Sequence, residues 1–133
     1  MPDYEVSVDI AVPPETAWAL LRDPSGISQW HPDYVRSHPV RDVRVLERAD
    51  GTKVQERFIS CDDDEFALVS RVTGGLPVEG HMNVFLVKPL HPGCRVTWWT
   101  RAEPDASGLD PGTWIPAEHH RALLALRDYL EDQ

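Results

Sequence analysis

One carboxylate in the sequence lies on a strand face that is otherwise apolar. In the segment 53–61, Val54 and Phe58 alternate with polar residues, so Glu56 shares their face while Arg57 points the other way. A carboxylate on an inward face is costly unless it is paired, protonated or hydrated by water in a cavity. Protonation or hydration would make Glu56 a candidate general base for removing a proton. The alternative is that Glu56 only holds a structural hydrogen bond or salt bridge.

The other reactive residue types form no recognisable nucleophile or metal motif. The sequence contains 6 histidines but no His-x-x-x-His pair, no His-Glu-x-x-His and no Cys-x-x-Cys. No Ser, Thr or Cys stands at a recognisable spacing from a base, which disfavours covalent catalysis. We therefore predict no metal and no cofactor. Cys61 and Cys94 fall in predicted strands, and we expect both thiols to be reduced.

The elements that must position these side chains follow from hydrophobic periodicity. Residues 3–12 alternate between apolar and polar, as a half-buried strand does. Short helices are expected over about 15–22 and 27–30. Further strands are expected over 41–48, 53–61, 66–73, 79–89 and 94–103. A single long helix is expected over about 115–131, with an inward stripe of Ile115, His119, Ala122, Leu123, Leu126 and Leu130.

This order of elements predicts an α+β fold in one domain, 1–133, with a curved antiparallel sheet wrapped around the C-terminal helix. Alternation also assigns the faces of two strands. Val43 and Val45 are expected inside and Arg44 outside. In the strand 66–73 the expected inward residues are Phe66, Leu68, Ser70 and Val72. We expect Trp18 and Trp30 to pack between the short helices and the sheet, and Trp98 to lie outside or at an interface.

Charge restricts the expected partners. The 133 residues carry a net charge of -9 without a cluster of Lys or Arg, which makes nucleic acid and anionic membranes poor partners. No apolar signal segment is recognised, and we expect a cytoplasmic protein that does not insert into membranes. A homodimer is a candidate assembly.

Three short motifs carry a resemblance to a known family. They are Trp30-His31-Pro32, Gly74-Gly75-Leu76-Pro77-Val78 and Val96-Thr97-Trp98. Together with the first strand, they resemble the START/Bet v 1-like (SRPBCC) superfamily, in particular its polyketide cyclase/dehydrase branch. The resemblance implies a helix-grip fold, with two short helices after the first strand, that encloses a hydrophobic ligand-binding cavity. We expect a volume of roughly several hundred Å³.

The resemblance also implies which residues face the cavity. In the related plant abscisic acid receptors, the counterpart of Glu56 places a carboxylate in the pocket, and the segment 74–78 corresponds to a mobile loop at its mouth. His31 replaces a pocket lysine of those receptors, so hormone recognition is not implied. The implied register points His81, Asn83, Phe85, Thr97, Trp99 and Arg101 inward. We expect the mouth loop to act as a lid, with Leu76 exposed when the cavity is empty.

The resulting hypothesis is a cofactor-independent cyclase or dehydratase acting on a polyketide-like, hydrophobic carbonyl substrate. Either Glu56 or His81 would be the base, and His31, Asn83 or Arg101 would donate hydrogen bonds to the developing oxyanion. The remaining expected substrate contacts are Trp99, Ser70, Thr97, Val54, Phe58, Val72, Phe85, Leu76, Trp114 and His119. The alternative is a non-catalytic carrier or sensor of a lipid, isoprenoid or aromatic metabolite, in which the same polar residues only anchor one end of the ligand.

Overall fold

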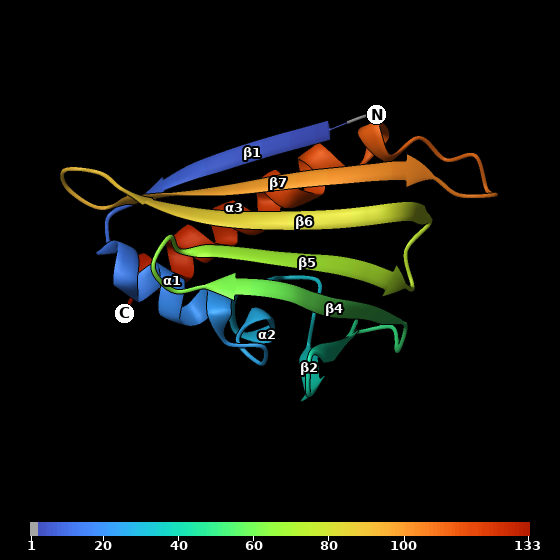
Figure 1. Ribbon diagram of the computed structural model, residues 1–133, viewed down its shortest axis with the longest axis horizontal. Coiled ribbons are helices and arrows are strands. Elements are labelled where there is room, and N and C mark those ends of the chain that lie inside the picture. The colour runs from blue at the N-terminus through green and yellow to red at the C-terminus, as the bar shows by residue number, and fades with distance from the viewer. Residues whose placement is uncertain (1–2) are drawn as a thin grey trace.

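The computed structural model describes residues 3–133, so the first two residues of the predicted domain lie outside the described residues. Strands pair in the order β1-β7-β6-β5-β4-β3-β2 to form a single curved antiparallel sheet (Figure 1). Their bounds are Asp3–Ile10 (β1), Arg36–Val40 (β2), Val43–Glu47 (β3), Lys53–Asp62 (β4), Ala67–Gly74 (β5), Val78–Pro89 (β6) and Cys94–Pro104 (β7). This arrangement confirms the predicted α+β helix-grip architecture.

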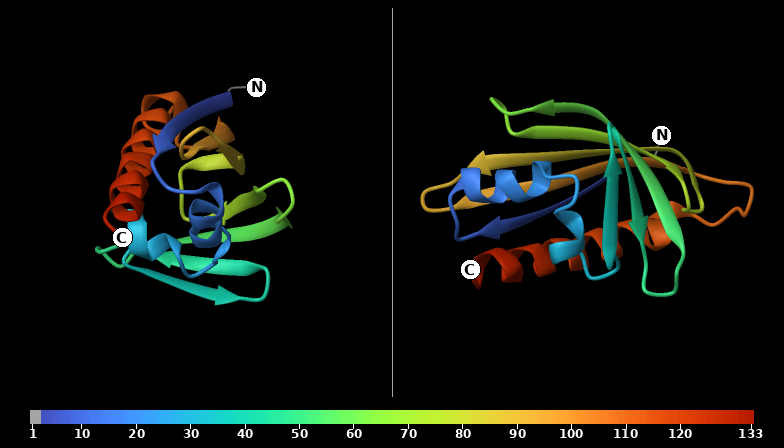
Figure 2. Two further views of the ribbon diagram at one scale, coloured as in Figure 1. Left: turned by 90° about the vertical axis from the view of Figure 1, so that its left-hand side faces the viewer. Right: turned by 90° about the horizontal axis from the view of Figure 1, so that it is seen from below.

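The helices cover one face of the sheet (Figure 2). Helix α1, Pro14–Arg22, and helix α2, Ile27–Trp30, follow β1; the short η1, Pro111–Thr113, precedes the long α3, Ile115–Glu131. All members of the predicted α3 stripe are buried, which confirms the helical period. No helix within residues 3–133 has both the length and the apolar character needed to cross a membrane.

Aromatic side chains fasten the short helices to the sheet. Trp18 of α1 stacks on Phe66 with ring centroids 5.4 Å apart, and Trp30 of α2 meets Phe85 of β6 edge-on at 6.5 Å. The Trp18 indole N–H also donates to the Asp63 carboxylate at 2.8 Å. The predicted packing of both tryptophans is confirmed.

The predicted register of β7 is wrong by one residue. Val96, Trp98, Thr100 and Ala102 are buried on the inner face. Thr97, Trp99 and Arg101 therefore lie on the outer face, where Arg101 pairs with Asp3 of β1 at 3.0 Å. Apolar Cys94, Val96 and Trp98 alternate with polar Arg95 and Thr97, so the sequence itself favours the observed register, and the wrong one came from the family resemblance. Trp98 was correspondingly misassigned to the outside.

The predicted faces of β3 are also reversed. Arg44 and Leu46 are buried, whereas Val43 and Val45 are only half-buried. An arginine is normally placed outside, but here the carboxylate of Glu56 on the neighbouring β4 compensates its charge.

The edge strand β2 was missed because its sequence, Arg-Ser-His-Pro-Val, is polar and contains a proline. Proline has no backbone N–H to donate, and at the edge of the sheet Pro39 has no neighbouring strand that would require one on its open side. β2 therefore pairs with β3 alone.

Candidate functional site

A cavity of about 30 Å³ lies between the inner face of the sheet and the helices. It is lined by Ile27, His31, Tyr34, Arg44, Leu46, Val54, Glu56, Val72, Leu76, His81, Asn83, Phe85, Trp98, Trp114, Glu118 and His119. This volume holds only about one or two water molecules. The expected volume of several hundred Å³ is therefore wrong for this conformation, and a larger ligand requires the wall to move.

Most predicted site residues lie at this cavity. Those lining it are His31, Val54, Glu56, Val72, Leu76, His81, Asn83, Phe85, Trp114 and His119. Ser70 is buried directly behind Glu56, and Phe58 packs beneath the Arg44 guanidinium with 4.9 Å between the guanidinium carbon and the ring centroid. Thr97, Trp99 and Arg101 lie on the opposite face of β7, so their predicted contact with a substrate in this cavity is wrong. The functional roles of the residues that line the cavity stay predictions.

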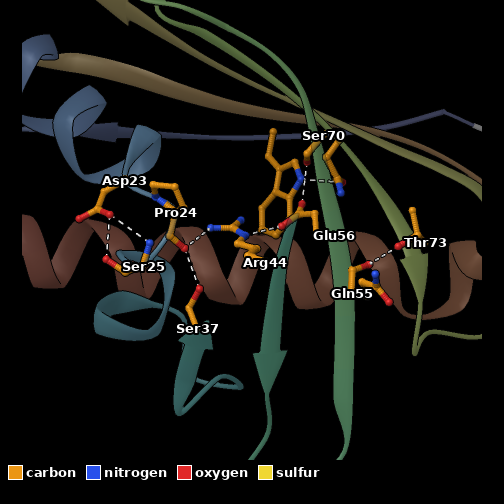
Figure 3. A network of polar contacts seen from close by, with 11 residues as sticks. Asp23, Pro24, Ser25, Ser37, Arg44, Gln55, Glu56, Ser70 and Thr73 are labelled. Atoms are coloured by element: carbon orange, nitrogen blue, oxygen red, sulfur yellow. Dashed lines mark hydrogen bonds and ion pairs between the residues drawn. The ribbon is translucent and has the colours of Figure 1, made fainter. Parts of the chain in front are cut away.

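One end of the cavity is built around a buried ion pair (Figure 3). Arg44 Nε donates to Glu56 Oε1 at 2.6 Å, and Ser70 Oγ donates to Glu56 Oε2 at 2.6 Å. Arg44 also donates to the backbone carbonyl of Pro24 at 3.2 Å, which in turn accepts from Ser37 Oγ at 2.6 Å. We call Arg44, Glu56 and Ser70 the ion-paired end.

The ion-paired end satisfies both carboxylate oxygens. The side chains of Arg44 and Glu56 are only 4% and 6% exposed, so neither charge is hydrated from outside. A buried carboxylate bound by a guanidinium and a hydroxyl is compensated in place. The geometry thus favours the structural alternative for Glu56, that of a salt bridge, over a free proton acceptor.

Three histidines, His31, His81 and His119, line the same cavity, and we call them the histidine cluster. Burial lowers the pKa of His31 to about 4 and that of His119 to about 2. Burial also lowers the pKa of His81. The protonated form loses hydration in such surroundings, so all three imidazoles are neutral at pH 7.

Hydrogen bonds orient two of these rings. His31 Nδ1 accepts from the backbone N–H of Asp33 at 3.1 Å. His119 Nδ1 lies 3.3 Å from Thr100 Oγ1, and the His119 ring stacks on Trp98 with centroids 3.5 Å apart and planes 7° apart. A short backbone turn and a neighbouring strand therefore fix the direction of both imidazoles.

His81 differs because neither of its ring nitrogens makes a hydrogen bond of normal geometry within residues 3–133, although the Asn83 side chain lies near enough to oppose part of the lowering of its pKa. The residue is 2% exposed and lies at the cavity. Among residues 3–133, the indole nitrogen of Trp114 at the same cavity is also buried without a partner. Leaving such a group unpaired costs about 1–3 kcal/mol. These atoms are consequently the strongest candidates for contacting a bound molecule.

An acidic pair lies beside the histidine cluster. Burial raises the pKa of Glu118, and the neighbouring Asp33 carboxylate raises it further. Arg121 binds Asp33 at 2.8 and 3.0 Å. His31, Asp33 and Glu118 each place one potential metal-ligand atom within 4.8 Å of the others. The Arg121 guanidinium already binds the Asp33 carboxylate, so this grouping is a poor cation site. The absence of a metal stays a prediction.

The sequence interpretation missed several lining residues. These are Ile27, Tyr34, Arg44, Leu46, Trp98 and Glu118. Helical spacing held a signal for Glu118, which follows Trp114 by four positions and Ile115 by three. For Trp98, the alternation of Val96, Trp98 and Ala102 with Thr97 and Arg101 was present, and only the adjacent Trp99 departs from it.

The mouth loop is anchored more firmly than its glycines suggested. Gly75 has φ +93, and a Cβ there would lie 2.1 Å from the Lys53 carbonyl oxygen of β4. At Gly74 a Cβ would meet nothing within 4 Å. Leu76 is half-buried and packs against the core at the cavity wall. The predicted exposure of its side chain is therefore wrong, and the expected lid loses its basis.

A family model described as "Polyketide cyclase / dehydrase and lipid transport" matches residues 1–131. The chain belongs to this family. Curated protein sequences contain no match to the chain. The protein XoxI from Bacillus cereus has a similar structure, with a TM-score of 0.91 and 21% identity over 99% of this chain and 97% of that one. A protein from Bacillus thuringiensis aligns with a TM-score of 0.88 and 20% identity over 97% and 98% of the two chains.

A solved structure with bound small molecules has the same fold. Norcoclaurine synthase from Thalictrum flavum, solved in complex with dopamine and hydroxybenzaldehyde, aligns with a TM-score of 0.73 and 15% identity. The alignment covers 98% of this chain and 84% of the synthase. At such identity the likeness establishes a Bet v 1-like fold, and the family supports a role in binding a hydrophobic ligand.

Proposed function

We propose that the protein is a cofactor-independent cyclase or dehydratase that acts on a polyketide-like, hydrophobic carbonyl compound. The observation that carries the proposal is His81, a buried and neutral imidazole at the cavity whose two nitrogens make no hydrogen bond of normal geometry in residues 3–133. A neutral imidazole offers one lone pair and one N–H, which are the groups needed for general acid–base chemistry.

The proposed reaction begins with removal of a proton α to the substrate carbonyl. His81 accepts this proton, and the electron pair of the broken C–H bond moves toward the carbonyl oxygen. His31 and the Asn83 amide nitrogen donate hydrogen bonds to that oxygen as its negative charge develops. Attack of the resulting enolate on a second carbonyl gives an alkoxide, which takes the proton back from His81 to complete cyclisation. In dehydration, a β-hydroxyl group leaves as water with that same proton. Both outcomes balance without an oxidant or reductant.

Glu56 takes a supporting role in this proposal. Its two oxygens are bonded to Arg44 and Ser70, so it holds β3, β4 and β5 together at the cavity wall. The aldehyde bound by norcoclaurine synthase is a carbonyl ligand in the same fold, which is compatible with a carbonyl ligand here. Phe85 and Trp98, whose ring centroids are 4.6 Å apart, would pack against the apolar part of the substrate.

A simple ketone tests the proton-transfer step. Benzylacetone carries an aromatic ring, one carbonyl and exchangeable α protons, and its exchange in deuterated buffer is followed by NMR. We expect the protein to accelerate α-deuteration and His81→Phe to reduce the acceleration by ~10² or more. Arg101→Gln, on the outer face, is the control and should retain full acceleration. Exchange at the buffer rate with benzylacetone bound, or equal exchange by His81→Phe, would contradict the proposal.

A non-catalytic carrier or sensor is the second candidate. It is favoured because Arg44 and Ser70 already bond both oxygens of Glu56, so this carboxylate is not a free base. In that case benzylacetone binds but its α protons exchange at the buffer rate. In either case the cavity wall must open to admit benzylacetone, because the cavity has a volume of only about 30 Å³. The net charge of -9 supports a small neutral ligand over nucleic acid, while the cytoplasmic location and the homodimer stay predictions.

A further inference from the structure

The tautomer of His119 is determined by a chain of hydrogen bonds that starts at Trp98. An indole nitrogen only donates, so the Asn83 atom 2.9 Å from Trp98 Nε1 must be the amide oxygen. Thr100 Oγ1 lies 2.9 Å from the same oxygen, which only accepts, so the Thr100 hydroxyl donates to it. Thr100 has then used its one proton and must accept from His119 Nδ1 at 3.3 Å. Neutral His119 therefore carries its proton on Nδ1 and a lone pair on Nε2.

His31 has the opposite tautomer. Its Nδ1 accepts from the Asp33 backbone N–H at 3.1 Å, so Nδ1 carries the lone pair. The neutral ring then carries its proton on Nε2, which becomes a donor. In both histidines Nδ1 is engaged by the protein, and within residues 3–133 neither Nε2 has a protein hydrogen bond. The Nε2 edges are thus the parts left to meet a ligand.

The two rings flank one indole at the cavity. His119 stacks on Trp98 at 3.5 Å, and His31 meets the edge of the Trp98 ring system at 6.3 Å between centroids. Both histidines are buried, with exposures of 5% and 3%, and both line the cavity. The wall around Trp98 therefore presents an acceptor and a donor at two separate positions.

We propose that the cavity selects ligands that carry a hydroxyl donor for His119 Nε2 and, at a separate position, a carbonyl acceptor for His31 Nε2–H. This inference rests on the proposed function, because it assumes that the cavity is the ligand site, and it narrows the substrate class to hydroxylated ketones, including phenolic ketones. A saturated fatty acid, whose carboxylate has no donor at neutral pH, does not match the pattern.

The tautomers are tested directly by long-range proton–nitrogen correlation NMR on the full chain. We expect the lone pair on Nε2 in His119 and on Nδ1 in His31 at neutral pH. Thr100→Val should disturb the His119 pattern and leave that of His31 intact. Protonation of His119 at Nε2, or of His31 at Nδ1, would overturn the inference, whether or not a ligand is known.

The selectivity is tested with three matched compounds. Para-hydroxyacetophenone carries both groups; para-methylacetophenone replaces the hydroxyl with a methyl group of similar size, and para-ethylphenol lacks the carbonyl. We expect the hydroxy ketone to bind about tenfold more tightly than either analogue, which is the scale of one hydrogen bond to a buried partner. His119→Phe should remove the preference over the methyl compound, and His31→Phe the preference over ethylphenol.

Several outcomes separate this inference from the proposed catalysis. Equal binding of the hydroxy and methyl compounds by the native protein, or an unchanged preference in folded His119→Phe, would overturn the hydrogen-bond pattern. The predicted preferences without any α-deuteration of benzylacetone would support the pattern and contradict the cyclase proposal. Circular dichroism confirms the fold of each variant, and the NMR measurement on the native chain needs no variant.

Discussion

The ion-paired end and the histidine cluster bury ionisable groups at the same cavity in opposite ways. At the first, Arg44 and Glu56 keep their charges and compensate each other at 2.6 Å. At the second, His31, His81 and His119 are neutral because burial lowers their pKa values. A charged pair depends on both partners, whereas a neutral imidazole remains free to use its second nitrogen.

This difference separates a structural region from a reactive one. The oxygens of Glu56 are occupied by the protein, while neither His81 nitrogen makes a hydrogen bond of normal geometry within the described residues. Disrupting the ion-paired end should therefore affect stability, and disrupting the histidine cluster should mainly affect ligand selection, chemistry and acid sensitivity.

The largest effect is expected for Arg44→Met. The variant removes the guanidinium and leaves the Glu56 carboxylate buried with only Ser70 as a partner. We expect a loss of about 3–5 kcal/mol in the free energy of unfolding, measured with urea at pH 7. The double variant Arg44→Met with Glu56→Leu should recover most of this loss, because no uncompensated charge remains. If the single variant is as stable as the native protein, the buried Glu56 carboxylate does not depend on Arg44 for its compensation.

Acid should weaken the protein through the histidine cluster. The pKa of His119 is about 2 in the folded chain and 6.5 as a reference, so below pH 6.5 the unfolded chain takes up the proton first. Stability is therefore lost as the pH falls, by about 2 kcal/mol from this one histidine between pH 6.5 and about 4.5.

His119→Phe isolates that contribution, because other titrating groups remain the same. We expect the decline in unfolding free energy between these two pH values to be about 2 kcal/mol smaller in the variant than in the native protein. The phenyl ring keeps the stacking on Trp98. Parallel pH profiles for the two proteins would mean that His119 is not buried in its neutral form.

The loop 74–78 should tolerate a substitution at Gly74 and not at Gly75. Gly75→Ala places a Cβ against the Lys53 carbonyl and requires a non-glycine residue at φ +93. We expect a loss of about 2 kcal/mol or more in unfolding free energy. Gly74→Ala, which meets nothing within 4 Å, should change stability by less than about 0.5 kcal/mol. Equal melting temperatures for the two variants would argue against the tight anchoring of this loop on β4.

The smallest effect is expected for Arg101→Gln. Like Arg44, Arg101 pairs with a carboxylate, but both Arg101 and Asp3 are 41% exposed. Water and salt screen such a pair, so the thermal midpoint should stay the same within error, and para-hydroxyacetophenone should bind as it does to the native protein. Lost binding would indicate that the outer face of β7 takes part in the site.

The sequence alone determined the order of the long elements, with β2 missed, and the α3 stripe and the inward faces of β4 and β5, because each of these carries a clear apolar period. The faces of β7 were predicted wrongly from the family resemblance, although apolar Val96 and Ala102 alternate with polar residues and only the outer Trp99 departs from this pattern. Pairing with β1 and β6 decides this register, since backbone hydrogen bonds connect strands that are distant in the sequence.

For the candidate site, too, the sequence determined one part and the tertiary structure the other. The sequence predicted that Glu56, His31 and His81 face a cavity, the last two through the family resemblance. Tertiary structure decided that Arg44 turns inward, because its partner becomes visible only once β3 and β4 are paired. It also decided the proton positions on His31 and His119, because these depend on single hydrogen bonds to the Asp33 backbone and to Thr100. Residue type establishes which groups can titrate, whereas the surrounding donors, acceptors and burial establish where each proton lies.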